Sequence, residues 1–266
     1  MRTSPRLLLA TSLLIPLAIC SAQEKSAQPM LPTHAPDGGT IERFASIFIP
    51  PTADAPFTAT VNTEWIRHLA DGSTITLVNH RTVARDAKGR IYQERAYFVP
   101  NDGKHESRVT QIEVSDPVIN QLYVCRAAEG VCHVRDLSLS AGAEFAGEAG
   151  PAKAGTPGFT VESLGTQYIS GLETIGTRET HVVAAASYGN EAPILERKEF
   201  WYSPQLGINL ITKREDPRFS SQQNFEVTNV RLGEPDANLF RPPAGDKIFD
   251  LRNAREVSTA PAVSPN

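Results

Sequence analysis

The chain has 266 residues, of which 40% are hydrophobic and 21% are charged, and its formal net charge is −4 at pH 7. This length allows one good-sized hydrophobic core, with room for a linker and a tail. The slightly negative net charge gives no sign of a basic surface that would bind nucleic acid, so we expect no nucleic-acid partner. After the N-terminal segment, no run approaches the ~20 apolar residues of a membrane span.

The N-terminal segment has the pattern of a secretory signal peptide. Two arginines precede an uncharged, leucine-rich run at 7–19, and small residues follow it. We expect residues 1–22 to be removed by cleavage near Ala22, and a periplasmic or secreted location. Lipid anchoring at Cys20 is the less favoured alternative, because bulky Ile19 stands where a small residue is normally wanted. The mature chain would carry 24 Lys and Arg against 30 Asp and Glu, a formal charge of −6.

Composition divides the mature chain into three parts. We expect a flexible segment at 23–40, a single β-rich domain at 41–250 and a disordered tail at 251–266, whose Ala, Ser, Pro and Val follow no period. Within the domain, residues 141–158 break the pattern, because eleven of these eighteen residues are Ala or Gly. Such a segment cannot bury enough surface to offset its ordering entropy. We interpret it as a flexible insertion between two halves of one sheet.

The domain begins with a predicted long β-hairpin. Apolar residues alternate along 57–69, and Asp71-Gly72 then predicts a two-residue turn into a second strand at 73–85. With that turn, Trp65 would stand opposite Val78. Both faces of this hairpin carry apolar residues, so both are expected to be at least partly covered.

The remaining elements are predicted from β-branched and aromatic residues that lie between turn signals. A helical turn is expected at 235–240, where Leu239 and Phe240 would close one end of the core. The expected fold is mainly β, a long, curved and unclosed antiparallel sheet with minor helical segments, and a β-sandwich is the alternative. The further strands are expected at 90–99, 108–114, 167–171, 176–186, 196–202, 207–213 and 223–230.

Cys125 and Cys132 are separated by six residues, and His133 follows the second. If Cys20 leaves with the signal peptide, they are the remaining thiols, an even pair in an oxidising compartment. Their valine-rich flanks and the loop 127–130 predict a β-hairpin that sets the two cysteines opposite each other, near disulfide geometry. The spacing is not typical of zinc fingers or of Cys-x-x-Cys exchange sites. We therefore predict a structural disulfide and no metal.

No sequence motif predicts catalysis or a cofactor. The chain has no Gly-x-Ser-x-Gly elbow, no phosphate-binding Gly-x-x-x-x-Gly-Lys run and no His-Glu-x-x-His zinc motif. In the predicted hairpin register, His68 and His80 lie on opposite faces and cannot share a metal. Carboxylates such as Glu162 and Glu179 alternate with apolar positions, which favours a solvated sheet face over an acid/base pair. We expect a non-enzyme.

Aromatic residues are the candidates for ligand contact. Large aromatic side chains supply much of the apolar area in a binding site, although in strands they commonly serve only to pack. The candidates are Trp65, Phe98, Phe200, Trp201 and Tyr202.

Over roughly residues 41–249 the chain resembles the periplasmic lipoprotein-carrier (LolA-like) superfamily. The resemblance is carried by the order of the segments and by Ile-Ser-Gly-Leu-Glu-Thr-Ile-Gly-Thr-Arg-Glu-Thr at 169–180, Glu-Phe-Trp-Tyr-Ser-Pro at 199–204 and Pro-Asp-Ala-Asn-Leu-Phe-Arg-Pro-Pro at 235–243. The chain is also similar to uncharacterised secreted bacterial proteins with the same closing motif. The resemblance implies an unclosed β-barrel whose concave apolar side holds acyl chains, or a sensor module for misplaced lipoproteins. The cysteine hairpin and the Ala/Gly segment depart from the family pattern.

Three functions are open at this point. The first is a secreted or periplasmic, non-enzymatic protein that binds a lipid or a lipidated protein in a concave apolar face. The second is a protein-interaction or envelope-sensor module without a small ligand, which contacts an envelope protein through exposed strands or the disulfide hairpin. A hydrolase or oxidoreductase is supported only by scattered polar residues, and fold alone does not choose among the three.

Overall fold

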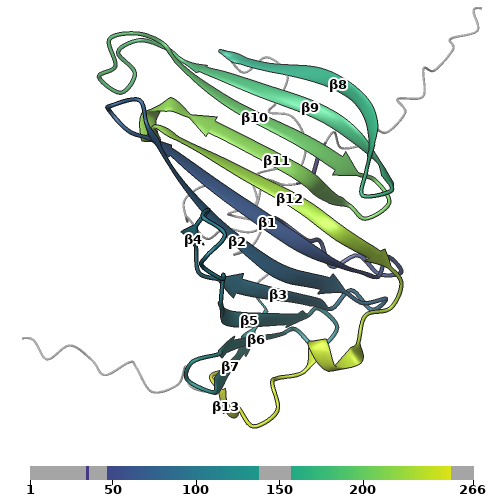
Figure 1. Ribbon diagram of the computed structural model, residues 1–266. Helices are drawn as coiled ribbons and strands as arrows, with labels where there is room; N and C mark the ends of the chain where they lie inside the picture. The colour runs from purple at the N-terminus through teal and green to yellow at the C-terminus, as the bar shows by residue number, and fades with distance from the viewer. Residues whose placement is uncertain (1–33, 36–46, 138–156, 253–266) are drawn as a thin grey trace, which may run out of the picture. The chain divides into compact units, whose positions relative to one another are not determined.

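The computed structural model describes residues 34–35, 47–137 and 157–252 (Figure 1). These residues form β-strands and two short 3₁₀ turns, and none of their helices is long and apolar enough to cross a membrane. The predicted signal peptide and nearly all of the predicted flexible segment, insertion and tail lie outside the described residues. The strands are β1 (Phe57–His68), β2 (Thr74–Arg85), β3 (Ile91–Ala96), β4 (Val99–Pro100), β5 (Val109–Asp116), β6 (Gln121–Arg126), β7 (Val131–Asp136), β8 (Phe159–Ile169), β9 (Leu172–Val183), β10 (Ile194–Ser203), β11 (Ile208–Asp216), β12 (Ser221–Leu232) and β13 (Lys247–Asp250).

All thirteen described strands belong to one sheet, in the order β13-β7-β6-β5-β3-β2-β1-β12-β11-β10-β9-β8, with β4 beside β2 (Figure 1). β13 and β8 form the two edges, so the sheet is not closed. The neighbouring strands are antiparallel, including β1 and β12, which lie far apart in the chain, whereas β13 is parallel to β7. The predicted fold class, a mainly β protein with one long unclosed sheet, is confirmed. A β-sandwich would need two sheets and is not formed.

The first hairpin differs from its predicted register by one residue. Trp65 pairs with Leu77, not with Val78, because the loop holds three residues and not two. Leu69 closes this loop: its N–H donates to the Ser73 carbonyl over 2.9 Å, and its carbonyl accepts from the Gly72 N–H. Gly72 has a φ of 82°, which fits the left-handed position of a three-residue loop.

Since a shift of one residue moves every side chain of a strand to the other face, it also changes the histidine prediction. His68 and His80 share one face, contrary to expectation. They remain far apart, because His80 pairs with Asn62, six positions before His68 along β1.

The cysteine hairpin forms as predicted. Cys125 pairs with Cys132 and Arg126 with Val131, and the two sulfur atoms are joined in a disulfide with a Cα–Cα distance of 3.9 Å. Gly130, with a φ of 62°, ends the four-residue loop. The prediction of a structural disulfide is confirmed.

Two clusters of buried apolar side chains lie against the sheet. The larger includes Phe57, Val61 and Phe225, all at most 1% exposed. The second forms where the 3₁₀ turn Ala237–Phe240 places Phe240 against Tyr92 of β3, Ala84 of β2 and Val114 of β5. The helical turn predicted at 235–240 is therefore present, and it builds a separate core.

The two edge strands of the sheet, β8 and β13, were shortened or missed by the sequence prediction. β8 begins at Phe159 and not at residue 167, and its first residues are mostly exposed, so burial leaves no pattern in them. β8 is held by its hairpin with β9, in which Ser170 and Gly171 have φ values of 51° and 80°, as a type I′ turn requires. β13 was not predicted, because its four residues are all exposed.

Candidate functional site

The strand register gives the sheet two faces of different chemistry. Thr63 pairs with Phe225, and Phe225 pairs with Thr212, so these side chains point to one face, named here the Phe225 face. Phe200 pairs with Thr212 and lies on the same face. Its neighbour Trp201 points to the opposite face, named the Trp201 face.

The aromatic candidates of β10 are divided between the two faces. Phe200 is fully buried on the Phe225 face, where the ring of His34 stacks on it with 4.1 Å between centroids. Trp201 lies on the other face over Gly176, close enough that a Cβ at Gly176 would stand 2.6 Å from the indole ring. Tyr202 returns to the side of Phe200, and burial raises the pKa of its phenol. Because neighbouring strand residues alternate, these three cannot line one site.

The other two candidates come together. The rings of Trp65 and Phe98 meet edge to face with 6.5 Å between centroids. Leu77 pairs with Trp65 on the Phe225 face, and all three side chains are half-buried. Ile75, the next residue of β2 on this face, is 45% exposed. We call Trp65, Leu77 and Phe98 the Trp65 patch.

The rest of the apolar surface on the Phe225 face is largely covered by the chain itself. Ile47 and Ile49, from the segment before β1, and Leu206, from the β10–β11 turn, are at most 6% exposed and belong to the larger core cluster. The apolar surface of this face that the described residues leave partly accessible therefore includes the Trp65 patch and not the core residues beneath this cover.

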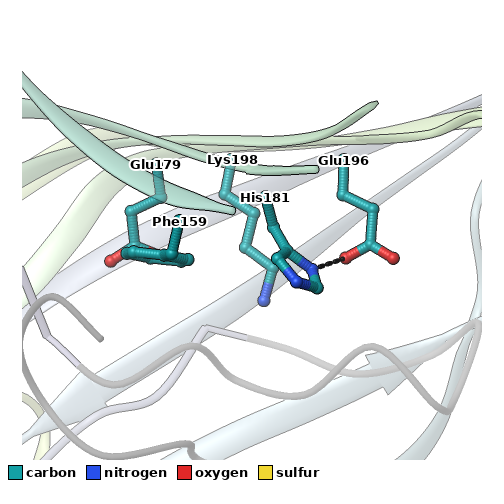
Figure 2. Close-up of a pocket in the computed structure, with 5 residues that line it drawn as sticks. All are labelled: Phe159, Glu179, His181, Glu196 and Lys198. Carbon is teal, nitrogen blue, oxygen red and sulfur yellow. Dashed lines mark hydrogen bonds and ion pairs between the residues drawn. The ribbon is translucent and has the colours of Figure 1, made fainter. Parts of the chain in front are cut away.

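A pocket of about 280 Å³ opens at the β8–β10 end of the sheet. Figure 2 shows the Phe159 ring and the Lys198 ammonium among the side chains that line it. By register these side chains lie on the Phe225 face, since Lys198 pairs with Glu179 and Phe159 with His181. The lining residues are Phe159, Glu179, His181, Glu196 and Lys198.

Acidic and basic groups are paired around this pocket. Nδ1 of His181 lies 3.2 Å from the Glu196 carboxylate (Figure 2), and Nε2 of His34 lies 2.8 Å from that of Glu179. Burial lowers the pKa of the Lys198 ammonium, while the charges of Glu179 and Glu196 oppose that shift. The five lining residues include no hydroxyl or thiol nucleophile. An aromatic wall with both signs of charge suits a ligand that has an apolar part and a polar end.

The sequence did not reveal this pocket. The sequence predicts a solvated face for Glu179 and Glu162. The Glu179 side chain is instead 12% exposed and bonded to His34, whereas that of Glu162 is 61% exposed, as predicted. The lining residues come from three strands and form no motif. The sequence signal that could have revealed the pocket is the charged residues at alternate positions of β9 and β10, because alternate residues of a strand share a face.

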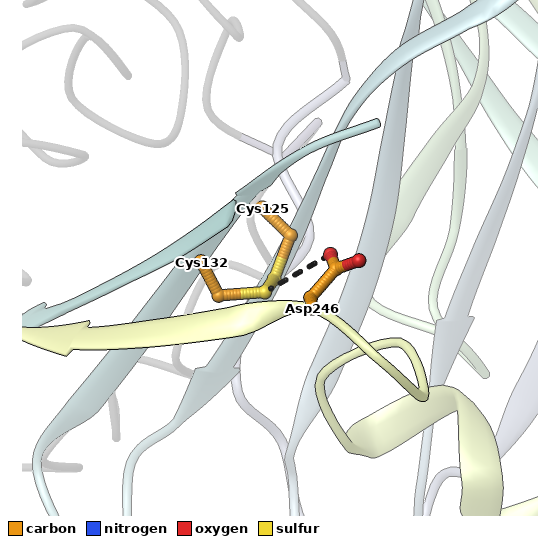
Figure 3. Close-up of side chains that lie close together, drawn as sticks. All are labelled: Cys125, Cys132 and Asp246. Carbon is orange, nitrogen blue, oxygen red and sulfur yellow. Dashed lines mark hydrogen bonds between the residues drawn. A yellow bond between two sulfur atoms is a disulfide. The ribbon is translucent and has the colours of Figure 1, made fainter. Parts of the chain in front are cut away.

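Cys125, Cys132 and Asp246 also lie close together, with potential ligand atoms within 4.8 Å of one another (Figure 3). Oδ2 of Asp246 is 3.5 Å from Sγ of Cys132. A disulfide sulfur carries no proton and is no thiolate, so this is a close contact and the oxidised pair offers no metal ligands. The group belongs to the disulfide and not to a metal centre.

Of the comparisons with known proteins, only the comparison with solved structures finds similar proteins. No model of a protein family matches the chain, and no curated protein does. An uncharacterised conserved protein from Thermus thermophilus has 12% identity and a TM-score of 0.37, over 73% of this chain and 90% of its own. A LolA superfamily protein from Nitrosomonas europaea has 12% identity and a TM-score of 0.30, over 70% and 90%.

MucB of Pseudomonas aeruginosa, in its complex with MucA, has 11% identity and a TM-score of 0.38. The match covers 74% of this chain, which spans 58% of that chain. A LolA superfamily protein is thus among the solved structures to which the chain is similar. At these identities the function has to be argued from the residues of this chain.

Proposed function

We propose that this chain is an exported, non-enzymatic binding protein that holds a lipid or a lipidated protein on the Phe225 face of its sheet. The observation that carries the proposal is the Trp65 patch, three half-buried apolar side chains on the face where the β8–β10 pocket also opens. Apolar area removed from water contributes roughly 25 cal/mol per Å², so an acyl chain across this patch would supply the main binding energy. Polar groups on the same face would orient the other end of the ligand.

This proposal reduces the candidate ligand-contacting residues to two. Trp65 and Phe98 are the proposed contacts with the acyl chain. His34 covers Phe200, and Tyr202 lies on the same side of the sheet as Phe200. Both would therefore pack beneath the site. Trp201 lies on the opposite face and would take no part.

Native mass spectrometry tests the proposal. The protein, exported to a periplasm and purified without detergent, is expected to carry an extra mass in the acyl-lipid range that leaves on denaturation. Trp65→Ala should lower the occupied fraction. Trp201→Ala is the matched control, because it removes the same side chain from the other face, and it should retain the ligand. A bare chain that also has no affinity for acylated ligands would refute the proposal.

The β8 edge favours a second candidate, a protein-interaction module. Among the described residues β8 pairs with β9 alone, and its eleven residues include no lysine or proline, which commonly protect exposed edges. A partner strand could add to this edge. In a pull-down from envelope extracts, Val161→Lys should reduce the captured partner, and Val118→Lys, at an exposed turn, should not. Capture of nothing above background by the unaltered protein would count against this candidate.

A further inference from the structure

β2 carries two buried arginines that differ in their partners. Arg85 is fully buried, and it donates hydrogen bonds to three backbone carbonyls. Its Nε and Nη2 reach the Ala55 carbonyl over 3.0 and 2.8 Å, Nη1 reaches that of Pro50 over 2.9 Å, and Nη2 also reaches that of Leu206 over 2.8 Å. Arg85 therefore joins three segments of the fold, which is a sufficient structural reason for a buried guanidinium.

Arg81, four residues earlier, is 3% exposed but has far fewer partners. Its Nη2 donates to the Thr63 hydroxyl over 3.2 Å, and its guanidinium lies 6.0 Å from the centre of the Phe225 ring. Its Nε is buried without a hydrogen-bond partner. Burial lowers the pKa of Arg81 to about 9, and the charge of Arg95 acts in the same direction.

The nearby carboxylate does not balance this charge by direct contact. Glu113 attracts Arg81, but its carboxylate is bound by Arg95 with 3.0 Å between Nη2 and Oε2. A buried charge is costly unless it is paired and hydrogen-bonded. Arg81 thus lacks the hydrogen-bond partners that offset the cost of burial for Arg85.

A second incompletely bonded group lies beside Arg81. Asn79 is 1% exposed, and its Nδ2 donates to the Ala96 carbonyl over 3.2 Å, but its Oδ1 has no partner. Residues two apart on a strand share a face at about 7 Å. Along the Phe225 face of β2 the order is therefore Arg81, Asn79, Leu77 and Ile75, from a buried cation to an exposed apolar side chain.

We propose that Arg81 binds an anionic group, a carboxylate or a phosphate, of the ligand whose chain lies on the Trp65 patch. The guanidinium supplies charge-assisted donors, and Oδ1 of Asn79 accepts from a hydroxyl or N–H beside the anionic group. The ligand enters with its anionic end toward Arg81 and its chain toward Ile75. This assignment rests on the proposed function, since the same face has to hold an acyl chain.

The test uses three probes on the full mature chain: inorganic phosphate, dodecyl phosphate and dodecanol, with the two amphiphiles below their aggregation concentrations. Calorimetric titration should show that dodecyl phosphate binds more tightly than dodecanol. Arg81→Gln should weaken dodecyl phosphate about ten- to hundredfold and leave dodecanol unchanged. Arg197→Gln is the control, because this arginine lies on the Trp201 face, and it should change neither affinity.

The other outcomes separate the two proposals. If Arg81→Gln leaves dodecyl phosphate binding unaltered while both amphiphiles bind, the lipid function stands and the role of Arg81 is overturned. If inorganic phosphate binds as tightly as dodecyl phosphate and Arg81→Gln abolishes both, the anion site is supported for a free anion and the lipid function falls. Failure of all three probes to bind the unaltered protein would overturn both.

Stability measurements keep a folding defect from imitating a binding defect. Because Arg81 is incompletely bonded, Arg81→Gln should melt no lower than the unaltered protein. Arg85→Gln should melt clearly lower, since it removes the guanidinium that donates to three carbonyls. A large loss of stability in Arg81→Gln would assign Arg81 a structural role and overturn the inference.

Discussion

The Trp201 face is built in two different ways along the same sheet. In the half that contains β3 and β5, this face is apolar, and the turn Ala237–Phe240 covers it. In the half from β8 to β12 the described residues place a polar group on this face, in which Glu199 pairs with Arg178 and Lys213. Covered apolar area stabilises a fold strongly, while exposed ion pairs each contribute about 0–1 kcal/mol. The comparison predicts that the first half is sensitive to substitutions on this face, and the second half much less so.

Phe240→Ala should have the largest effect. It removes the ring that packs on Tyr92 and Val114, and such truncations in cores cost about 3–5 kcal/mol. The free energy of unfolding from denaturant titration measures the loss. Phe219→Ala is the control, because Phe219 is 70% exposed, and it should change stability little. Equal losses in the two variants would mean that the turn does not form a core.

Loss of the disulfide should come next. Replacing Cys125 and Cys132 together with Ser should cost about 2–3 kcal/mol, because the bridge closes only a short loop. Thermal melting of the double variant, compared with the unaltered protein under oxidising conditions, measures the cost. Binding should be unaltered, because the bridge lies on the Trp201 face; lost binding at unchanged stability would contradict the structural role.

Gly176→Ala tests the close packing of Trp201 in the half from β8 to β12. The new Cβ would lie 2.6 Å from the Trp201 ring and 2.8 Å from Cβ of Leu164, so the side chains must shift, at a cost of about 1–3 kcal/mol. Trp201→Leu in the same chain should recover part of this loss. A double-mutant cycle measures the coupling, and a coupling near zero would show that Trp201 relaxes freely.

Glu199→Gln should have the smallest effect, and it should depend on pH. Burial acts to raise the pKa of Glu199, but the hydrogen bonds from Trp201 and Arg178 and the charge of Lys213 outweigh it and hold this pKa below the ordinary 4.5. A depressed pKa stabilises the fold above the ordinary value, and this contribution is lost as pH falls through the folded-state pKa.

The difference in melting temperature between Glu199→Gln and the unaltered protein should therefore be present at pH 7 and shrink as the pH falls below 4.5. Added salt at pH 7 should reduce it as well. A difference that grows toward low pH would contradict the assigned sign.

Much of the fold followed from local patterns. The alternation of β1, the hairpin around Cys125 and Cys132 and the turn at Phe240 were all predicted, because period, turn residues and caps act over a few positions. The register of the first hairpin was wrong by one residue, since the loop took in Ala70 as well as Asp71 and Gly72. β13 and the start of β8 were missed, because exposed edge strands bury too little to leave an apolar pattern.

The aromatic residues stay predicted ligand contacts. What the sequence could not show is that Trp65 meets Phe98 and that Phe200 and Trp201 lie on opposite faces, because both depend on contacts between strands. The incompletely bonded Arg81 has no signature in the sequence, where it stands beside other polar residues of β2.

The sequence by itself determined that this chain forms antiparallel hairpins, carries one disulfide and contains no familiar catalytic motif. These properties depend on residues that are neighbours in the chain or on residue types alone. Only the tertiary structure decided that β1 pairs with β12, that the C-terminal turn covers one half of one face, and that a buried cation lies in line with an apolar patch. Those outcomes depend on which side chains exclude water from one another across long separations, and no local pattern encodes that.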